Sequence, residues 1–187
     1  MSALLAAMAL PGYPARPMLV TSNRADAAGL ASTGGVPTLV VPSRGRTRED
    51  FEAELDAGLR AHGVELVALA GFMRVLTPGF CARWKGRMIN IHPSLLPSFP
   101  GLDTHARALA AGVRLHGCTV HWVSPGVDEG PIIAQSAVPV LPGDNAAGLA
   151  ARVLAREHVL YPAALALVAG RAATLPLAGA LDCLWLP

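Results

Sequence analysis

The stretch Met88-Ile89-Asn90-Ile91-His92-Pro93-Ser94-Leu95-Leu96-Pro97 begins as an apolar strand and ends in a loop bounded by prolines. Asn90 and His92 stand two residues apart, so on an extended strand their side chains point to the same face. In an open parallel sheet, ligands bind where strands give way to loops. An amide donor beside a titratable imidazole suits a reaction in which a carbonyl oxygen gains negative charge. The stretch therefore predicts a reactive site at a strand end.

On both sides of this stretch, short apolar segments alternate with helix-like segments. We expect strands at 17–21, 38–41, 64–70, 87–91, 118–123 and 131–138, and helices at 2–9, 25–32, 48–62, 78–85, 104–111 and 145–168. This alternation predicts an α/β fold with a Rossmann-like open, mostly parallel twisted sheet and an antiparallel edge. No internal repeat or linker divides the 187 residues, so a single domain, 1–187, is expected.

Three local features sharpen this expectation. The continuous apolar run 64–70 is typical of a strand that is buried on both faces. Asp144 is a candidate N-cap for the last helix. Pro162 is expected to end or kink that helix, because proline cannot donate the helical hydrogen bond.

Composition limits the classes of function. Hydrophobic residues make up 52% of the chain and charged residues 15%, so a sizeable core is expected and disorder is not. The net charge of +2 comes from dispersed cations, which argues against a nucleic-acid partner. No apolar run looks long enough to span a bilayer, which argues against a membrane partner. The three cysteines lack C-x-x-C spacing and no histidines have metal-site spacing, which favours free thiols in a reducing cytoplasm and no metal.

Two further loops carry unusual residues after apolar segments. One is Val127-Asp128-Glu129-Gly130-Pro131, and the other is Gly71-Phe72-Met73-Arg74-Val75-Leu76. If the strands are parallel neighbours, both loops converge with Asn90 and His92 on one rim. Each feature alone also has a structural interpretation, as a turn former, a satisfied polar residue or a solvated turn. Ser94 is expected to be a turn residue because no base is placed to activate it, and His121 could be a core residue or support the site.

Six motifs occur in one order along residues 1–170. They are 70–78, 90–97, 99–105, 116–121, 128–131 and 157–162, which read AGFMRVLTP, NIHPSLLP, FPGLDTH, HGCTVH, DEGP and EHVLYP. Together they resemble the phosphoribosylglycinamide formyltransferase family. The resemblance implies transfer of a formyl group from 10-formyltetrahydrofolate to the amine of glycinamide ribonucleotide (5-phosphoribosylglycinamide) in de novo purine biosynthesis, with no metal.

The resemblance also implies roles for individual residues. Asn90, His92 and Asp128 form the catalytic set: the amide donates to the oxyanion, the imidazolium stabilises it or passes a proton, and the carboxylate relays protons through water. The folate co-substrate would contact Arg48, Met73, Arg74, Val75, Leu76, Asn90, Ser124, Pro125, Gly126, Val127 and Asp128. The ribonucleotide would contact Leu154, Ala155, Arg156 and Glu157, with Glu157 holding its amine.

The chain departs from the family pattern at its start. The family begins with a strand and a Gly/Ser/Asn loop that binds the substrate phosphate through backbone amides. Here the residues from Met1 onward already match the helix that follows this loop. We therefore expect an N-terminally truncated domain that lacks its first central strand, with the missing part encoded upstream. The other interpretation is a complete chain that has lost phosphate binding.

Other functions remain open at this point. A formyltetrahydrofolate hydrolase would use the same three catalytic residues with water as the acceptor, although it normally carries a further regulatory domain. A non-catalytic folate-binding remnant lacking the phosphate loop is a third possibility. A methionyl-tRNA formyltransferase would need a tRNA-binding domain and more positive charge. A cytoplasmic enzyme, monomeric or homodimeric, is the leading interpretation.

Overall fold

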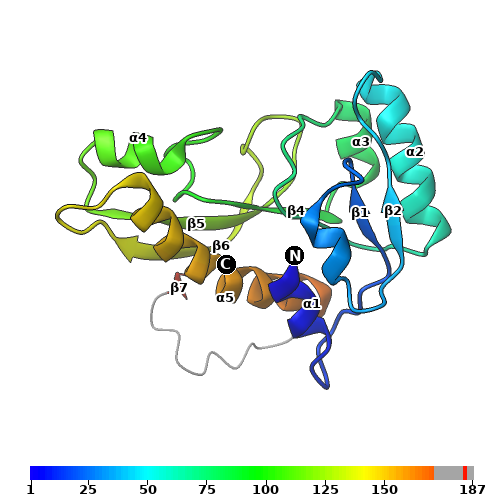
Figure 1. The fold of residues 1–187 in the computed structure, drawn as a ribbon, viewed down its shortest axis with the longest axis horizontal. Helices are drawn as coiled ribbons and strands as arrows, with labels where there is room; N and C mark the ends of the chain where they lie inside the picture. Colours follow the sequence, from blue (N-terminus) through cyan, green and yellow to red (C-terminus); the bar gives the residue numbers. More distant parts are fainter. Residues whose placement is uncertain (171–182, 185–187) are drawn as a thin grey trace.

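The computed structural model describes residues 1–170 and 183–184 (Figure 1). The helices are α1 Ser2–Met8, η1 (a 3-10 helix) Ala28–Ser32, α2 Arg48–Ala61, α3 Pro78–Arg83, α4 Thr104–Ala110 and α5 Ala146–Gly170. The strands are β1 Val20–Ser22, β2 Thr38–Val40, β3 Val67–Leu69, β4 Met88–His92, β5 Leu115–Trp122, β6 Ile132–Pro139 and β7 Cys183–Leu184. The predicted alternation of strands and helices, and hence the α/β class, is confirmed. Apart from β7, the tail after residue 170 lies outside the described residues.

The sheet is mixed, so the prediction of a mostly parallel sheet is wrong. In the five-stranded order β3-β4-β5-β6-β7, only β3 and β4 pair in parallel, and the other neighbours are antiparallel. The unexpected pairing is that of β5 with β4, which is antiparallel although α4 lies between the two strands in the chain. Strand β6 then pairs with β5 as a hairpin, without a crossover helix. The antiparallel part therefore extends from the edge of the sheet into its centre.

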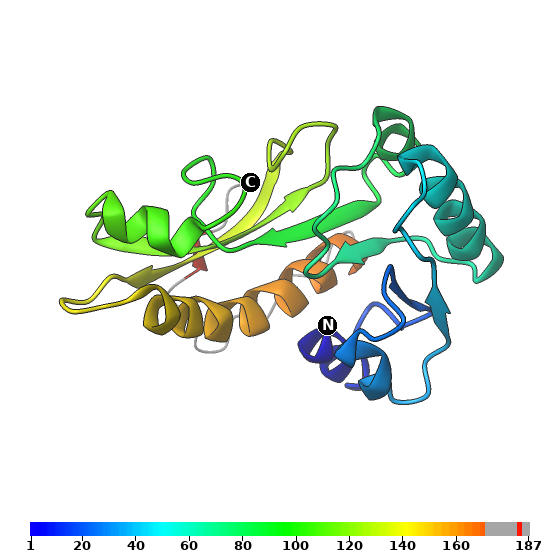
Figure 2. The same ribbon diagram turned by 45° about the horizontal axis from the view of Figure 1, so that its top comes forward.

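A second, separate sheet consists of the parallel strands β1 and β2, which stand apart from the larger sheet in Figure 2. Val20 N–H donates to the Pro37 carbonyl and Val67 N–H donates to the Arg87 carbonyl. Because amides alternate in direction along a strand, those of Thr21 and Ala68 point away from these partners. Strand β3 is only half-buried, which contradicts the prediction that 64–70 is buried on both faces. It also has one paired neighbour within the described residues.

Two hydrophobic cores lie on opposite faces of β4. Ile89 packs with α5 in one core, whereas its neighbour Met88 packs with α2 and α3 in the other. The α2–α3 core also includes Val41 and Leu39, so it joins the small sheet to the large one. By the alternation of a strand, Asn90 and His92 continue the face of Met88. The side chains of Asn90 and His92 therefore lie beyond the α2–α3 core, on the face of β4 opposite Ile89 and its α5 core.

Helix α5 corrects two expectations and narrows a third. It is long and apolar enough by composition to cross a membrane, contrary to the prediction that no segment is. In this fold it packs on β5 and β6 through its buried residues, as a core helix does (Figure 2). Pro162 lies inside the helix, so of the two predicted outcomes, an end or a kink, the end is excluded. The N-terminal cap is Asn145, whose Oδ1 accepts from Gly148 N–H, while Asp144 binds Arg152 instead.

Candidate active site

A cavity of about 670 Å³ brings the three predicted loops together. Its lining includes 71–76 after β3, 90–93 at the end of β4 and 123–128 after β5. The predicted convergence of the three loops is confirmed, but it does not arise from parallel neighbouring strands as predicted. Strand β5 runs antiparallel to β4, so its loop begins beside the start of β4, where Val123 N–H donates to the Met88 carbonyl. The loop must fold back along the sheet to bring Asp128 to His92.

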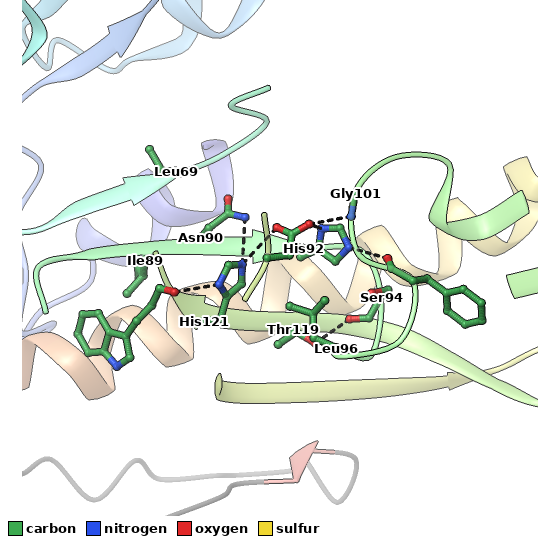
Figure 3. Close-up of polar contacts among 12 residues, drawn as sticks. Leu69, Ile89, Asn90, His92, Ser94, Leu96, Gly101, Thr119 and His121 are labelled. Carbon is green, nitrogen blue, oxygen red and sulfur yellow. Dashed lines mark hydrogen bonds and ion pairs between the residues drawn. The ribbon is translucent and has the colours of Figure 1, made fainter. Parts of the chain in front are cut away.

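Strand register places four polar side chains on one face of β4 and β5. Asn90 lies opposite His121, and His92 lies opposite Thr119. Because both pairs alternate with core residues such as Ile89 and Val120, the four polar side chains share the face away from α5. Figure 3 shows this cluster with its hydrogen bonds and ion pairs.

The His92 ring lies between two acceptors. Its Nδ1 is 3.1 Å from Oδ2 of Asp128, and its Nε2 is 3.0 Å from the Phe99 carbonyl (Figure 3). A carbonyl oxygen can only accept, so Nε2 carries a proton. A second proton on Nδ1 would complete a charge-assisted contact with the carboxylate. The site is thus arranged to hold an imidazolium, with only 7% of the side chain exposed.

Asp128 is fixed by its backbone and by a second hydrogen bond. Its φ of 57° lies in the left-handed region, which is unusual for a residue with a side chain and marks an over-determined position. Gly101 N–H donates to Oδ2 at 2.9 Å, and Oδ1 lies 3.6 Å from His121 Nε2. One oxygen is therefore committed to His92 and Gly101, while the other faces the His121 side of the cavity.

A buried network holds the loop that follows His92. The Thr119 hydroxyl donates to the Ser94 carbonyl at 2.7 Å and accepts from Leu96 N–H at 3.0 Å. Gln135 Nε2 donates to both the Leu96 carbonyl and the Thr119 hydroxyl. The Ser94 hydroxyl donates to the Ser98 carbonyl, which confirms Ser94 as a turn residue. Sequence reasoning missed Thr119 and Gln135, although polar residues alternating with apolar ones in 118–121 were a usable signal.

Comparison with known proteins identifies the fold. A family model described as "Formyl transferase" matches residues 1–165. The chain belongs to the formyl transferase family. A solved phosphoribosylglycinamide formyltransferase from Brucella melitensis is 49% identical, with a TM-score of 0.85, over 94% of this chain and 91% of that one.

Two other relatives of this formyl transferase differ in length. The human trifunctional purine biosynthetic protein adenosine-3 is 46% identical over 172 residues, which are 90% of this chain but 17% of that protein. The chain therefore spans less than a fifth of the length of this curated relative. A solved formyltetrahydrofolate deformylase from Pseudomonas syringae is 30% identical, with a TM-score of 0.77, over 83% of this chain and 52% of that one.

The predicted folate contacts fall into two groups in this formyl transferase. Met73, Arg74, Val75 and Leu76 line the cavity, as do Asn90, Ser124, Pro125, Gly126, Val127 and Asp128. Arg48 does not line it and lies in the first turn of α2. The neighbouring Phe51 stacks on Phe72 and lies under the Arg74 guanidinium at 5.2 Å. Helix α2 thus anchors the loop 71–76 through Phe51.

Glu52, which sequence reasoning overlooked, anchors the end of this loop. It is 2% exposed, and its carboxylate accepts from both the backbone N–H and the hydroxyl of Thr77. Thr77 in turn caps α3 by accepting from Phe80 N–H. The loop 71–76 therefore runs between two anchors, which holds its exposed side chains in place at the cavity.

The predicted ribonucleotide contacts are only partly brought together. Glu157 lines the main cavity, and it also lines a smaller apolar pocket of about 320 Å³ together with Leu154, Pro93 and His105. Ala155 and Arg156 line neither. Burial raises the pKa of the Glu157 carboxyl. Among the described residues, no group of histidine, cysteine, aspartate and glutamate side chains could hold a metal ion.

Proposed function

We propose that this chain transfers the formyl group of 10-formyltetrahydrofolate to the amine of 5-phosphoribosylglycinamide, in de novo purine biosynthesis. The observation that carries the proposal is the arrangement of Asn90, His92 and Asp128 around one end of the cavity. A solved relative that matches this chain over most of both lengths is a phosphoribosylglycinamide formyltransferase. We further expect the chain to work in the cytoplasm, as a monomer or homodimer and without a metal.

In the proposed reaction, the substrate amine attacks the formyl carbon, and the carbonyl oxygen becomes an oxyanion. The Asn90 amide donates a hydrogen bond to this oxygen, and the His92 imidazolium stabilises its charge. When the intermediate collapses, the bond from carbon to N10 of the folate breaks. The amine loses one proton and N10 gains one, and Asp128 relays the proton through its open Oδ1 and a water. Protons and charge therefore balance without a metal.

The cavity lining suits the two proposed ligands. Met73, Val75 and Val127 are 77%, 51% and 49% exposed at its rim, which leaves apolar surface for a flat ring system such as a pterin. Glu157 reaches the same cavity from α5 and offers an acceptor for the amine or hydroxyls of a ribonucleotide. We propose that its partly buried carboxylate contacts the ribonucleotide, with Leu154 beside it.

We also propose that a further strand completes the domain between β1 and β3. Each of these strands has one paired neighbour in the described part of the chain. The pair β1–β2 and the pair β3–β4 both contribute side chains to the α2–α3 core. An extended segment running parallel to both would satisfy backbone groups that now lack strand partners. The loop at its end would reach the same rim as those after β3 and β4, where a phosphate could be bound.

A formyltetrahydrofolate hydrolase is the competing function, because the same cluster could activate water. The similarity to the Pseudomonas syringae deformylase structure is lower, at 30% identity over about half of that chain. This difference favours the amine as acceptor.

One experiment separates the alternatives. The purified chain is given 10-formyltetrahydrofolate with and without glycinamide ribonucleotide, and both tetrahydrofolate and formylated ribonucleotide are measured. The proposal predicts formylated ribonucleotide in a one-to-one ratio with tetrahydrofolate. Tetrahydrofolate release at the same rate without the amine would establish a hydrolase instead, and folate binding without turnover would establish a binding remnant. His62→Gln, which changes a histidine at the end of α2 outside the cavity lining, is a matched control for His92→Gln.

A further inference from the structure

The contacts between Asn90 and His121 fix which atom of the Asn90 amide faces the cavity. His121 lies directly opposite Asn90 in the β4–β5 register and is 2% exposed. Its Nδ1 is 3.0 Å from the Trp122 carbonyl, and its Nε2 is 3.2 Å from Nδ2 of Asn90 (Figure 3). Both ring nitrogens therefore have defined partners, and these partners determine the tautomer.

The Trp122 carbonyl can only accept, so Nδ1 of His121 carries a proton. In the neutral ring, Nε2 then has a lone pair and accepts from the Asn90 amide nitrogen. Burial lowers the pKa of His121, which favours this neutral form. The charged groups facing the ring are Asp128, with Oδ1 at 3.6 Å, and His92 on β4.

Local backbone geometry supports the contact between Nδ1 of His121 and the Trp122 carbonyl. Trp122 N–H pairs with the Pro131 carbonyl, and a register shift occurs between Val120 and His121. A Cβ at Gly130 would collide with the Trp122 carbonyl, so only glycine allows this close approach. The hairpin is thus shaped to bring the Trp122 carbonyl beside the His121 ring.

We propose that His121 is a positioning residue, which as the Nδ1–H tautomer holds the Asn90 amide so that its second N–H faces the formyl oxygen. The inference rests on the proposed function. An Asn amide that flipped would present its oxygen to the developing oxyanion, and repulsion would replace stabilisation. His121 itself contacts neither substrate in this account.

The first test is spectroscopic and needs no turnover. Long-range proton–nitrogen NMR of the ¹⁵N-labelled chain should show His121 with protonated Nδ1 and unprotonated Nε2 at neutral pH. A protonated Nε2 would overturn the proposal. This measurement stands even if the chain shows no formyl transfer, so failure of the tautomer and failure of the proposed function are distinguishable.

The second test is kinetic. His121→Ala should lower kcat by roughly a hundredfold, within the range for losing one oxyanion donor, with the KM for folate within about threefold. His121→Gln, whose side-chain oxygen can accept from Asn90, should restore at least about tenfold of that loss. Val120→Ala removes a buried side chain from the opposite face of β5 and should leave kcat unchanged at temperatures where it is folded.

A double-mutant cycle completes the test. If His121 acts through Asn90, adding His121→Ala to Asn90→Ala should cost less than about threefold in kcat. A further loss of about a hundredfold in the double variant would show that His121 acts independently, and the proposal would fail. It would also fail if His121→Ala kept kcat within threefold of the wild-type value.

Discussion

The two halves of this molecule differ in how completely their backbone and side chains are paired. Around β4 and β5, neighbouring strands are hydrogen-bonded on both sides, and His92, His121 and Thr119 each have defined partners. Around β1 and β3, each strand has one neighbour within the described residues. The contrast shows that the reactive cluster depends on strands β4 to β6 and their loops. It forms here while β1 and β3 each have one neighbour within the described residues.

The first prediction concerns the oxyanion donor of the β4–β5 half, where a large loss of activity is expected. Asn90→Ala removes the amide N–H that faces the formyl oxygen, and we expect kcat to fall by about 10²–10³. Steady-state formyl transfer measures this effect. Asn145→Ala, which removes the cap of α5 instead, should cost about 1 kcal/mol of stability and leave kcat unchanged. An equal loss of kcat in both variants would contradict the assignment.

The second prediction concerns the buried Thr119 network, which holds the loop that follows His92. Thr119→Val keeps the shape of the side chain but leaves Leu96 N–H and the Ser94 carbonyl without their partner. The free energy of unfolding should fall by about 1–3 kcal/mol, the usual cost of unsatisfied buried groups. Urea denaturation measures it. Thr21→Val, at an exposed threonine of β1, should change stability by less than about 0.5 kcal/mol and serves as the control.

The third prediction tests the open half. The amides of Thr21 and Ala68 point away from their paired neighbours, so they should exchange with solvent faster than those of Val20 and Val67. Residue-resolved hydrogen exchange of residues 1–187 reports the difference. Slow exchange at all four amides would show that the space beside β1 and β3 is already closed, against the proposed additional strand.

The smallest expected effect lies outside both halves, at the turn before α5. The Arg152 guanidinium, together with Leu141 N–H, lowers the pKa of Asp144 to about 2. The stability from this pair is therefore present above pH 3.8 and is lost as the pH falls towards 2. The difference in Tm between the wild-type chain and Asp144→Asn should shrink over that interval. A difference that stays constant from pH 6 to pH 2 would refute this linkage.

The sequence was informative where a feature depends on neighbouring residues. Alternation along 88–92 correctly placed Asn90 and His92 on one face, and the order of elements correctly predicted the α/β class. Features that depend on pairing between distant strands could not be predicted from the sequence. The antiparallel direction of β5 arises from its pairing with β4, and the register of that pairing sets Asn90 opposite His121; both join segments that lie far apart in the sequence.

Two predicted ligand contacts show the same limit. Arg48 and Arg156 lie on helices whose rotation relative to the cavity is fixed by buried neighbours such as Phe51 and Val153, and neither lines the cavity. Asp128 was predicted by motif, but its approach to His92 depends on a loop folding back with a left-handed residue. Local patterns therefore identified the reactive residues better than the geometry that joins them.

The central claim is that the cluster around His92 performs formyl transfer. Its most direct test is the turnover of His92→Ala at saturating 10-formyltetrahydrofolate and glycinamide ribonucleotide, with folate affinity measured separately by titration. The account predicts a fall in kcat between roughly 10² and 10⁴, with folate affinity within about threefold of the wild-type value. Formyl transfer by His92→Ala within threefold of the wild-type rate would contradict it.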